Sequence, residues 1–119
     1  MSYIFDVGED TIWSPSLRVG RLYVALADCM AAEDGQNTGL DAVADDMYQI
    51  DPPVFEDFVR TVYEDFFSTD HRIYRELLRG WLSVSLVLME RAGVRIEPET
   101  EEQKSFLSDI QEYARSMPR

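Results

Sequence analysis

The sequence contains few of the cysteine and histidine side chains that stabilise small folds through disulfides or metal sites. Its 119 residues include one cysteine, Cys29, and one histidine, His71. A single cysteine excludes a disulfide within the chain and a CxxC motif, and it fits a protein of the reducing cytoplasm. A structural zinc site needs about four nitrogen or sulfur ligands, so one chain cannot supply it. We therefore expect no cofactor and no metal.

Long apolar segments are also missing. The longest near-continuous run, WLSVSLVLM at 81–89, has nine residues, about half of the roughly 20 that a membrane-spanning helix requires. The first ten residues, MSYIFDVGED, carry acids where a secretory signal carries Lys or Arg. These features predict a cytoplasmic protein that neither enters a membrane nor is exported by that route.

Positive charge is scarce and unevenly placed. The chain has 11 Lys and Arg against 23 Asp and Glu, a net charge of −12. Residues 41–70, DAVADDMYQIDPPVFEDFVRTVYEDFFSTD, hold nine carboxylates and one cation, Arg60. Such a surface repels a phosphate backbone and attracts a basic partner, so electrostatics disfavours direct nucleic-acid binding.

Enough apolar residues are present, 45%, for one compact domain spanning residues 1–119. Apolar residues recurring at three and four positions predict four helices, at about 15–34, 52–67, 71–92 and 101–116. Ser14-Pro15 and Asp51-Pro52 resemble helix starts, and Thr100 with Gln103 forms a capping box. The predicted fold class is mainly α, a four-helix domain with a minor β element.

Two of these helices have interpretable faces. In the first, Leu22, Leu26 and Cys29 recur with Tyr23 and Met30 at the spacing of a buried stripe. The third is apolar nearly all round after its first turns, which predicts a central buried element with Trp81 in the core. Its early turns carry Arg72, Arg75 and Arg79, for which we expect ion pairs with the acids of residues 41–70.

The minor β element is expected from three short segments. YIFDVGEDTIW at 3–13 predicts a hairpin or an extended arm, in which Trp13 anchors either the arm or a partner. MYQI at 47–50 predicts a short strand, and VRI at 94–96 a second one that pairs with it. GQNTGLDAVADD at 35–46 has the composition of a loop.

The acidic stretch is the candidate functional surface. Many carboxylates of 52–67 are explained as the wet face of an amphipathic helix, but the acids of 41–51 are not. Tyr48 lies among them and is a candidate aromatic anchor. The predicted partner-binding residues are Asp41, Asp45, Asp46, Tyr48, Asp51, Glu56 and Asp57.

The favoured function is a binding module that occupies a basic protein partner, in the manner of immunity proteins, antitoxins or nucleic-acid mimics. Two alternatives are open: the acids only keep the protein soluble, or the chain is a structural subunit or homo-oligomer without a ligand. A magnesium-dependent hydrolase using Asp45, Asp46 and Asp51 ranks lower, because no phosphate-binding loop accompanies them. We expect no enzyme and no catalytic residue.

Two further patterns are better explained by local structure. DGQNTGLDAVAD at 34–45 has the frame of a calcium loop, but Gln36 and Thr38 stand where Asp or Asn should be. His71 has no oxyanion loop or second histidine to support a catalytic role and is expected on the surface.

Four segments carry a resemblance to a known family: FDVGEDTIWSPS (5–16), ADDMYQIDP (44–52), MERAG (89–93) and ARSMP (114–118). Together they resemble an uncharacterised actinobacterial family of short acidic proteins, known only as a domain of unknown function. The resemblance implies a bacterial, cytoplasmic, stand-alone domain and brings no activity or site residue.

Overall fold

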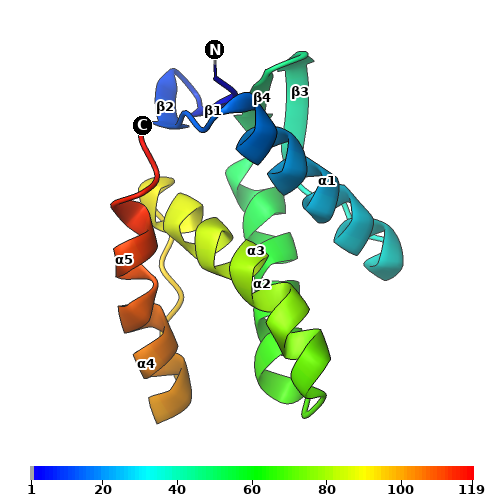
Figure 1. Ribbon diagram of the computed structural model, residues 1–119, viewed down its shortest axis with the longest axis vertical. Helices are drawn as coiled ribbons and strands as arrows, with labels where there is room; N and C mark the ends of the chain where they lie inside the picture. The colour runs from blue at the N-terminus through cyan, green and yellow to red at the C-terminus, as the bar shows by residue number, and fades with distance from the viewer. Residues whose placement is uncertain (1) are drawn as a thin grey trace.

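The computed structural model describes residues 2–119, which form an α+β fold with a small sheet at one end (Figure 1). The strands are β1 (Ile4–Val7), β2 (Asp10–Trp13), β3 (Leu40–Ala44) and β4 (Met47–Ile50). The helices are α1 (Leu17–Asp34), α2 (Pro52–Ser68), α3 (Arg72–Arg91), α4 (Glu101–Asp109) and α5 (Gln111–Ala114). The prediction of a mainly α four-helix domain is wrong, because the strands form one four-stranded mixed sheet in the order β2-β1-β4-β3.

The sheet joins two hairpins that are far apart in the sequence. The N-terminal hairpin is confirmed, with β1 antiparallel to β2 and Gly8 in the left-handed region at φ 61°. β1 also pairs in parallel with β4, and β3 pairs antiparallel with β4. Two predictions fail here: residues 40–44 are a strand and not a loop, and residues 94–96 are an extended connection outside the sheet.

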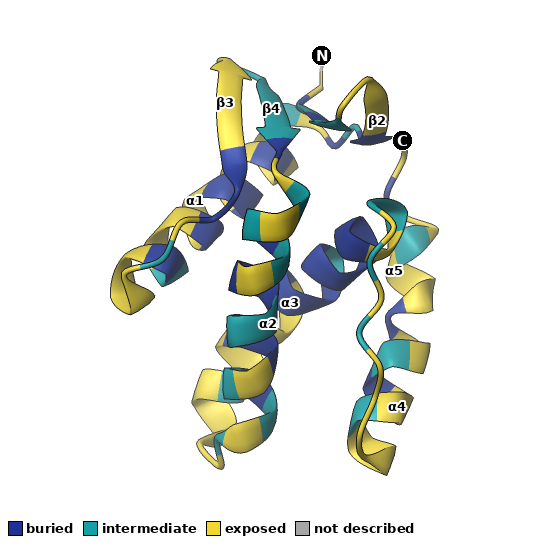
Figure 2. Cartoon of the chain, turned by 180° about the vertical axis from the view of Figure 1, so that it is seen from behind, coloured by how far each residue is buried: buried dark blue, intermediate teal, exposed yellow. Residues whose placement is uncertain are grey.

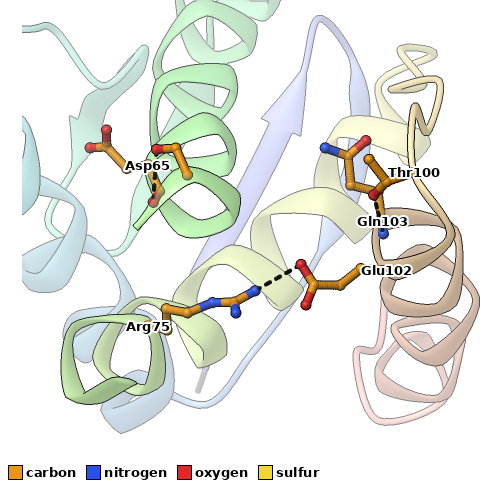
Figure 3. Close-up of polar contacts among 6 residues, drawn as sticks. Asp65, Arg75, Thr100, Glu102 and Gln103 are labelled. Carbon is orange, nitrogen blue, oxygen red and sulfur yellow. Dashed lines mark hydrogen bonds and ion pairs between the residues drawn. The ribbon is translucent and has the colours of Figure 1, made fainter. Parts of the chain in front are cut away.

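The helix bounds are close to the predicted ones, although Ser16, and not Ser14 of the predicted Ser14-Pro15 start, is the N-cap of α1. Ser16 Oγ accepts from the Val19 amide at 3.3 Å, and Gly35 ends α1 in the left-handed conformation. Thr100 Oγ1 accepts from the Gln103 amide at 3.1 Å and starts α4 (Figure 3). The predicted fourth helix is interrupted at Ile110, so that it forms α4 and α5.

A line of aromatic rings connects the layers of the core. From the sheet, Phe5 meets Tyr23 of α1 edge-on, with the ring centroids 5.7 Å apart. Tyr23 stacks on Trp81 of α3 at 5.6 Å, and Trp81 meets Phe58 of α2 at 5.2 Å. Trp81 is 4% exposed, so the prediction of a central α3 is confirmed for its second half. Trp13 is also buried against Phe5 and Tyr23, so it anchors the arm and not a partner.

The buried face of α1 is only partly the predicted one: Tyr23 is buried and Met30 packs partly buried against the core. Its buried residues are mainly small: Gly20, Tyr23, Val24, Ala27 and Ala31. A Cβ at residue 20 would lie 2.3 Å from Cγ of Tyr3, so only glycine allows this close approach. Leu22, Leu26 and Cys29, predicted to be core, are exposed. Small residues occupy the buried face of α1 because they allow the helix to lie close to Tyr3 of the N-terminal arm.

The C-terminal segment packs against the segment that follows β2. Ser14 donates its amide to the Pro118 carbonyl at 2.7 Å, and Met117 is buried. In both views α2 and the α4–α5 pair run along the long axis of the molecule, whereas α1 and α3 cross it obliquely (Figure 2). Within residues 2–119, none of the helices is both long and apolar enough to cross a bilayer.

Candidate functional site: an acidic sheet face

Three of the predicted partner-binding residues lie on the hairpin of β3 and β4. Asp41 is on β3, and Asp45 and Asp46 form the turn that leads into β4. β3 is an edge strand whose last four residues are all exposed. An edge strand leaves one row of backbone donors and acceptors without a ladder partner. The hairpin therefore presents its carboxylates on a projecting border of the sheet.

Tyr48 lies on the opposite face of the sheet from Asp41. Opposite residues of paired strands share a face, and the register places Tyr48 against Ala42 while Asp41 lies against Gln49. The Tyr48 ring stacks on Tyr3 at 5.8 Å, toward the side covered by α1. Burial, and then the nearby Tyr3, raises the pKa of the Tyr48 hydroxyl above its ordinary value. The Tyr48 ring therefore packs within the fold, on the face of the sheet opposite to Asp41.

The register reveals an acid that sequence reasoning missed. Asp6 of β1 lies beside Gln49 of β4 and opposite Thr11 of β2, and Gln49 lies opposite Asp41 of β3. These four side chains form one polar row across all four strands. Thr11 Oγ1 donates to the Asp6 carboxylate at 2.6 Å. The alternation of buried Phe5 with Asp6 is the sequence signal that could have identified it.

We call Asp6, Asp41, Asp45 and Asp46 the acidic sheet face. Phe5 and Tyr48 share the face of the sheet that packs on Tyr23 of α1, and the register places the row of Asp6 and Asp41 on the opposite face. Asp46 is tied into the sheet, since its carbonyl accepts from the Ile4 amide at 2.8 Å. The ladder therefore holds β1, which carries Asp6, on both sides, and β3, which carries Asp41, on one side.

The remaining predicted residues lie around the start of α2. Asp51 occupies the N-cap position without a side-chain capping bond, at the base of the hairpin, where its amide donates to the Gly39 carbonyl. The four-residue strand β4 separates Asp51 from the turn by about 13 Å. Glu56 pairs with Arg60 at 2.7 Å, and Asp57 is exposed on α2. The seven predicted residues therefore do not form one cluster.

Charge compensation is sparse over the described residues. Three salt bridges are present in residues 2–119, and they neutralise Glu56, Glu90 and Glu102. The four acids of the acidic sheet face take part in none of them. They are therefore free to interact with a cation from outside the chain.

Within residues 2–119, the arginines of α3 form no salt bridge with the acids of 41–70, which corrects their predicted pairing. Arg75 donates to Glu102 of α4 at 3.2 Å (Figure 3) and lies over the ring of Phe66, 4.7 Å from its centroid. Arg79 lies over the ring of Phe106 at 5.4 Å. Cation–π contacts of this kind place the guanidinium groups between α2, α3 and α4, at the end of the molecule away from the sheet.

The patterns considered for metals and catalysis have local roles. Over residues 2–119, no group of three His, Cys, Asp or Glu side chains is placed to hold one ion. Thr38, at a ligand position of the calcium-like frame, is buried, and its Oγ1 accepts from the Leu40 amide at 3.0 Å. His71 Nδ1 caps α3 by accepting from the Tyr74 amide at 3.2 Å.

One open hollow of about 370 Å³ lies where the 94–98 connection passes α3, α4 and α5. Its floor contains Leu86, Met89 and Ile110, and its rim mixes cations, such as Lys104, with acids, such as Glu97. Mixed charges on an open rim do not converge on one substrate atom.

The comparisons with known proteins identify a family without an assigned activity. The sequence matches, over residues 1–119, the model described as "Family of unknown function (DUF6086)". This match confirms the predicted resemblance to an uncharacterised family. No curated protein and no solved structure gives a significant match.

Proposed function

The chain belongs to the DUF6086 family of unknown function, and we propose that it is a binding module whose acidic sheet face occupies a basic protein partner. The observation that carries the proposal is the placement of uncompensated carboxylates on a rigid surface that the helices leave uncovered. Acids kept only for solubility need no particular backbone. Here Asp6 and Asp41 share one cross-strand row, and Asp45 and Asp46 border it.

Rigidity matters for the affinity of such a surface. Binding costs free energy whenever it immobilises loops or side chains. A strand that is already ordered in the free protein avoids most of the cost of immobilising a loop. The Asp6 carboxylate is already oriented by the hydrogen bond from Thr11. A partner's Arg or Lys meeting this row would therefore lose little free energy to ordering the protein.

The mode of attraction follows from the net charge of −12. A concentrated negative potential steers a cationic partner and raises its association rate constant by roughly 10- to 1,000-fold, an effect that salt weakens steeply. The single cysteine fits action in the reducing cytoplasm. Inhibition of a basic partner by occupying its surface is the biological role that this chemistry supports best.

The test is capture of partners from the native host, with surface plasmon resonance on the partner obtained. In the variant, Asp41, Asp45 and Asp46 are changed to Asn. In the matched control, three exposed acids of α4 and α5 lose the same charge, through Glu101→Gln, Asp109→Asn and Glu112→Gln. We expect the association rate constant to fall at least tenfold in the variant and to change little in the control.

Two results contradict the proposal. Equal losses in the two variants would mean that net charge matters and the acidic sheet face does not. A partner retained by the Asp41, Asp45 and Asp46 variant at unchanged affinity would place the interface elsewhere. Thermal unfolding of both variants controls for loss of folded protein.

A further inference from the structure

The exposed large apolar side chains are concentrated on two neighbouring helices. We call five of them the α1–α3 apolar face: Val19 (48% exposed), Leu22 (59%), Leu26 (43%), Ile73 (60%) and Leu77 (76%). The first three lie on α1 and the last two on the first turns of α3. Single exposed apolar residues are ordinary on protein surfaces, whereas a contiguous group commonly marks an interface.

These five residues face the same side of the molecule. Tyr23 of α1 contacts Trp81 and Ser85 of α3, whereas Glu33 and Asp34, at the end of α1, lie near Tyr74 at the start of α3. The two helices therefore run antiparallel. Successive residues of an α-helix are rotated by 100° about its axis. On each of the two helices, the exposed apolar residues therefore lie about 60–80° around the axis from the residues that contact the other helix, in the same rotational sense. In an antiparallel pair, equal rotations carry both stripes to one side.

The ribbon views agree with this geometry. α1 and α3 lie toward the viewer in Figure 1, with α2 behind α3, and α2 comes to the front in Figure 2. The side of α1 and α3 away from α2 therefore has no other element of the described chain over it.

We propose that this face binds a second copy of the chain about a two-fold axis, with α1 antiparallel to α1 of the partner subunit. Val19, Leu22, Leu26 and Cys29 are spaced three, four and three residues apart, the spacing of a helix–helix seam. A two-fold interface must be self-complementary. An antiparallel pair centred between Leu22 and Leu26 brings Leu22 of each subunit opposite Leu26 of the other.

The charges that flank the seam favour the same occupant. Arg18 lies about 9 Å from the centre toward the N-terminus, and Glu33 about 13 Å toward the C-terminus, on the same edge of α1 as Leu22. Neither forms a salt bridge within residues 2–119. Antiparallel pairing places each Arg18 near Glu33 of the other subunit, within the reach of an arginine side chain. A second copy thus supplies the opposite charge at both ends at once.

The net charge of −12 per chain sets the salt dependence. Two copies repel each other over distances beyond about 8–10 Å, and physiological salt screens that repulsion. Burial of leucine side chains is not screened. We therefore expect the dimer to strengthen from 20 to 200 mM salt, the opposite of the response expected for a basic partner at the acidic sheet face.

The first experiment measures the mass in solution by light scattering and sedimentation equilibrium across 1–200 µM protein, roughly the range of moderate dimer affinities. We expect twice the chain mass of 13.8 kDa at the upper end. Leu22→Glu and Leu77→Glu should each weaken the dimer roughly 30-fold or more, since each would bury a charge within the α1–α3 apolar face. Tyr113→Glu, at a 44% exposed position on α5, is the matched control and should leave it unchanged.

The second experiment tests the antiparallel register. Arg18→Glu and Glu33→Arg should each weaken the homodimer roughly tenfold, because both symmetric charge pairs become repulsive. An equimolar mixture of the two variants should recover dimer, because each mixed pair then has an attractive contact at both ends. A monomer at all concentrations, a dimer unaffected by Leu22→Glu, or a mixture without recovery would each overturn the proposal. Circular dichroism of every variant checks that the chain is folded.

Discussion

Arg91, at the end of α3, holds three distant parts of the chain together, and its loss should destabilise the fold without touching either proposed surface. Its guanidinium donates to the carbonyls of Ile12 at 2.7 Å, Met117 at 2.9 Å and Ala114 at 3.2 Å. These carbonyls belong to β2, the C-terminal segment and α5. Burial lowers the pKa of Arg91, but a guanidinium remains charged at neutral pH.

The magnitude follows from the number and kind of bonds. A hydrogen bond from a charged donor contributes about 1.5–3 kcal/mol net when buried. Arg91 is half-buried, so water can satisfy some of the freed carbonyls, and we expect Arg91→Met to cost about 2–4 kcal/mol in total. Arg91→Lys should cost less, because an ammonium group can retain one of the three bonds.

Urea unfolding followed by far-UV circular dichroism measures this loss, expected as a midpoint lower by about 1–2 M. Arg95→Met is the matched control, because Arg95 is 74% exposed and makes one long ion pair with Glu90 at 3.8 Å. A loss below about 0.5 kcal/mol for Arg91→Met, or an equal loss in the control, would refute the assignment of Arg91 as the tie.

Three other changes test the core. Trp81→Ala should cost about 3–5 kcal/mol of unfolding free energy, because it removes the ring between Tyr23 and Phe58; a loss under 1 kcal/mol would contradict its burial. Gly20→Ala should lower the free energy of unfolding by about 1–3 kcal/mol, because the added Cβ would force the Tyr3 ring aside. Thermal unfolding measures this loss, and Gly80→Ala is the control, because a Cβ at residue 80 meets nothing within 4 Å. Burial raises the pKa of Tyr23, although the bond to Ser85 lowers it slightly, so the unfolded state loses this proton first. Stability should therefore be full below about pH 10 and fall as the pH rises above it, with a shallower fall in Tyr23→Phe; equal slopes would contradict the shift.

The helices were predictable because their signals are local. Gly35 marks the end of α1 and Pro52 the start of α2, and the predicted bounds of both helices lie within about two residues of the observed ones. The sheet was only half predictable. β3 has one buried residue, Leu40, and reads as a loop, since its strand conformation comes from pairing with β4 and not from its own side chains. The parallel contact of β1 with β4 joins segments more than 40 residues apart, which no local pattern specifies.

The sequence indicates which candidate residues lie outside the helices, but not which face of the sheet each side chain occupies. Asp41, Asp45 and Asp46 were correctly placed outside any helix, but which sheet face a side chain occupies depends on register. A shift of one residue would exchange the faces. The register therefore places Tyr48 against Tyr3, and it places Asp6, which is distant in sequence, on the same face of the sheet as Asp41. In α1, ranking residues by size selected Leu22 and Leu26 for the core, whereas the close approach to Tyr3 required Gly20.

The two proposed surfaces should act independently, because they lie on different elements. The acidic sheet face belongs to β1, β3 and the β3–β4 turn, and the α1–α3 apolar face to two helices that lie on the other side of the sheet. A two-fold dimer would carry two acidic faces and bind two copies of a basic partner. Leu22→Glu should then halve the mass of the complex and leave the affinity per site unchanged, because no residue is shared. Light scattering of the complex with wild-type and Leu22→Glu protein measures this directly. An affinity that falls in Leu22→Glu would mean that the partner bridges both subunits, and the independence of the two faces would be refuted.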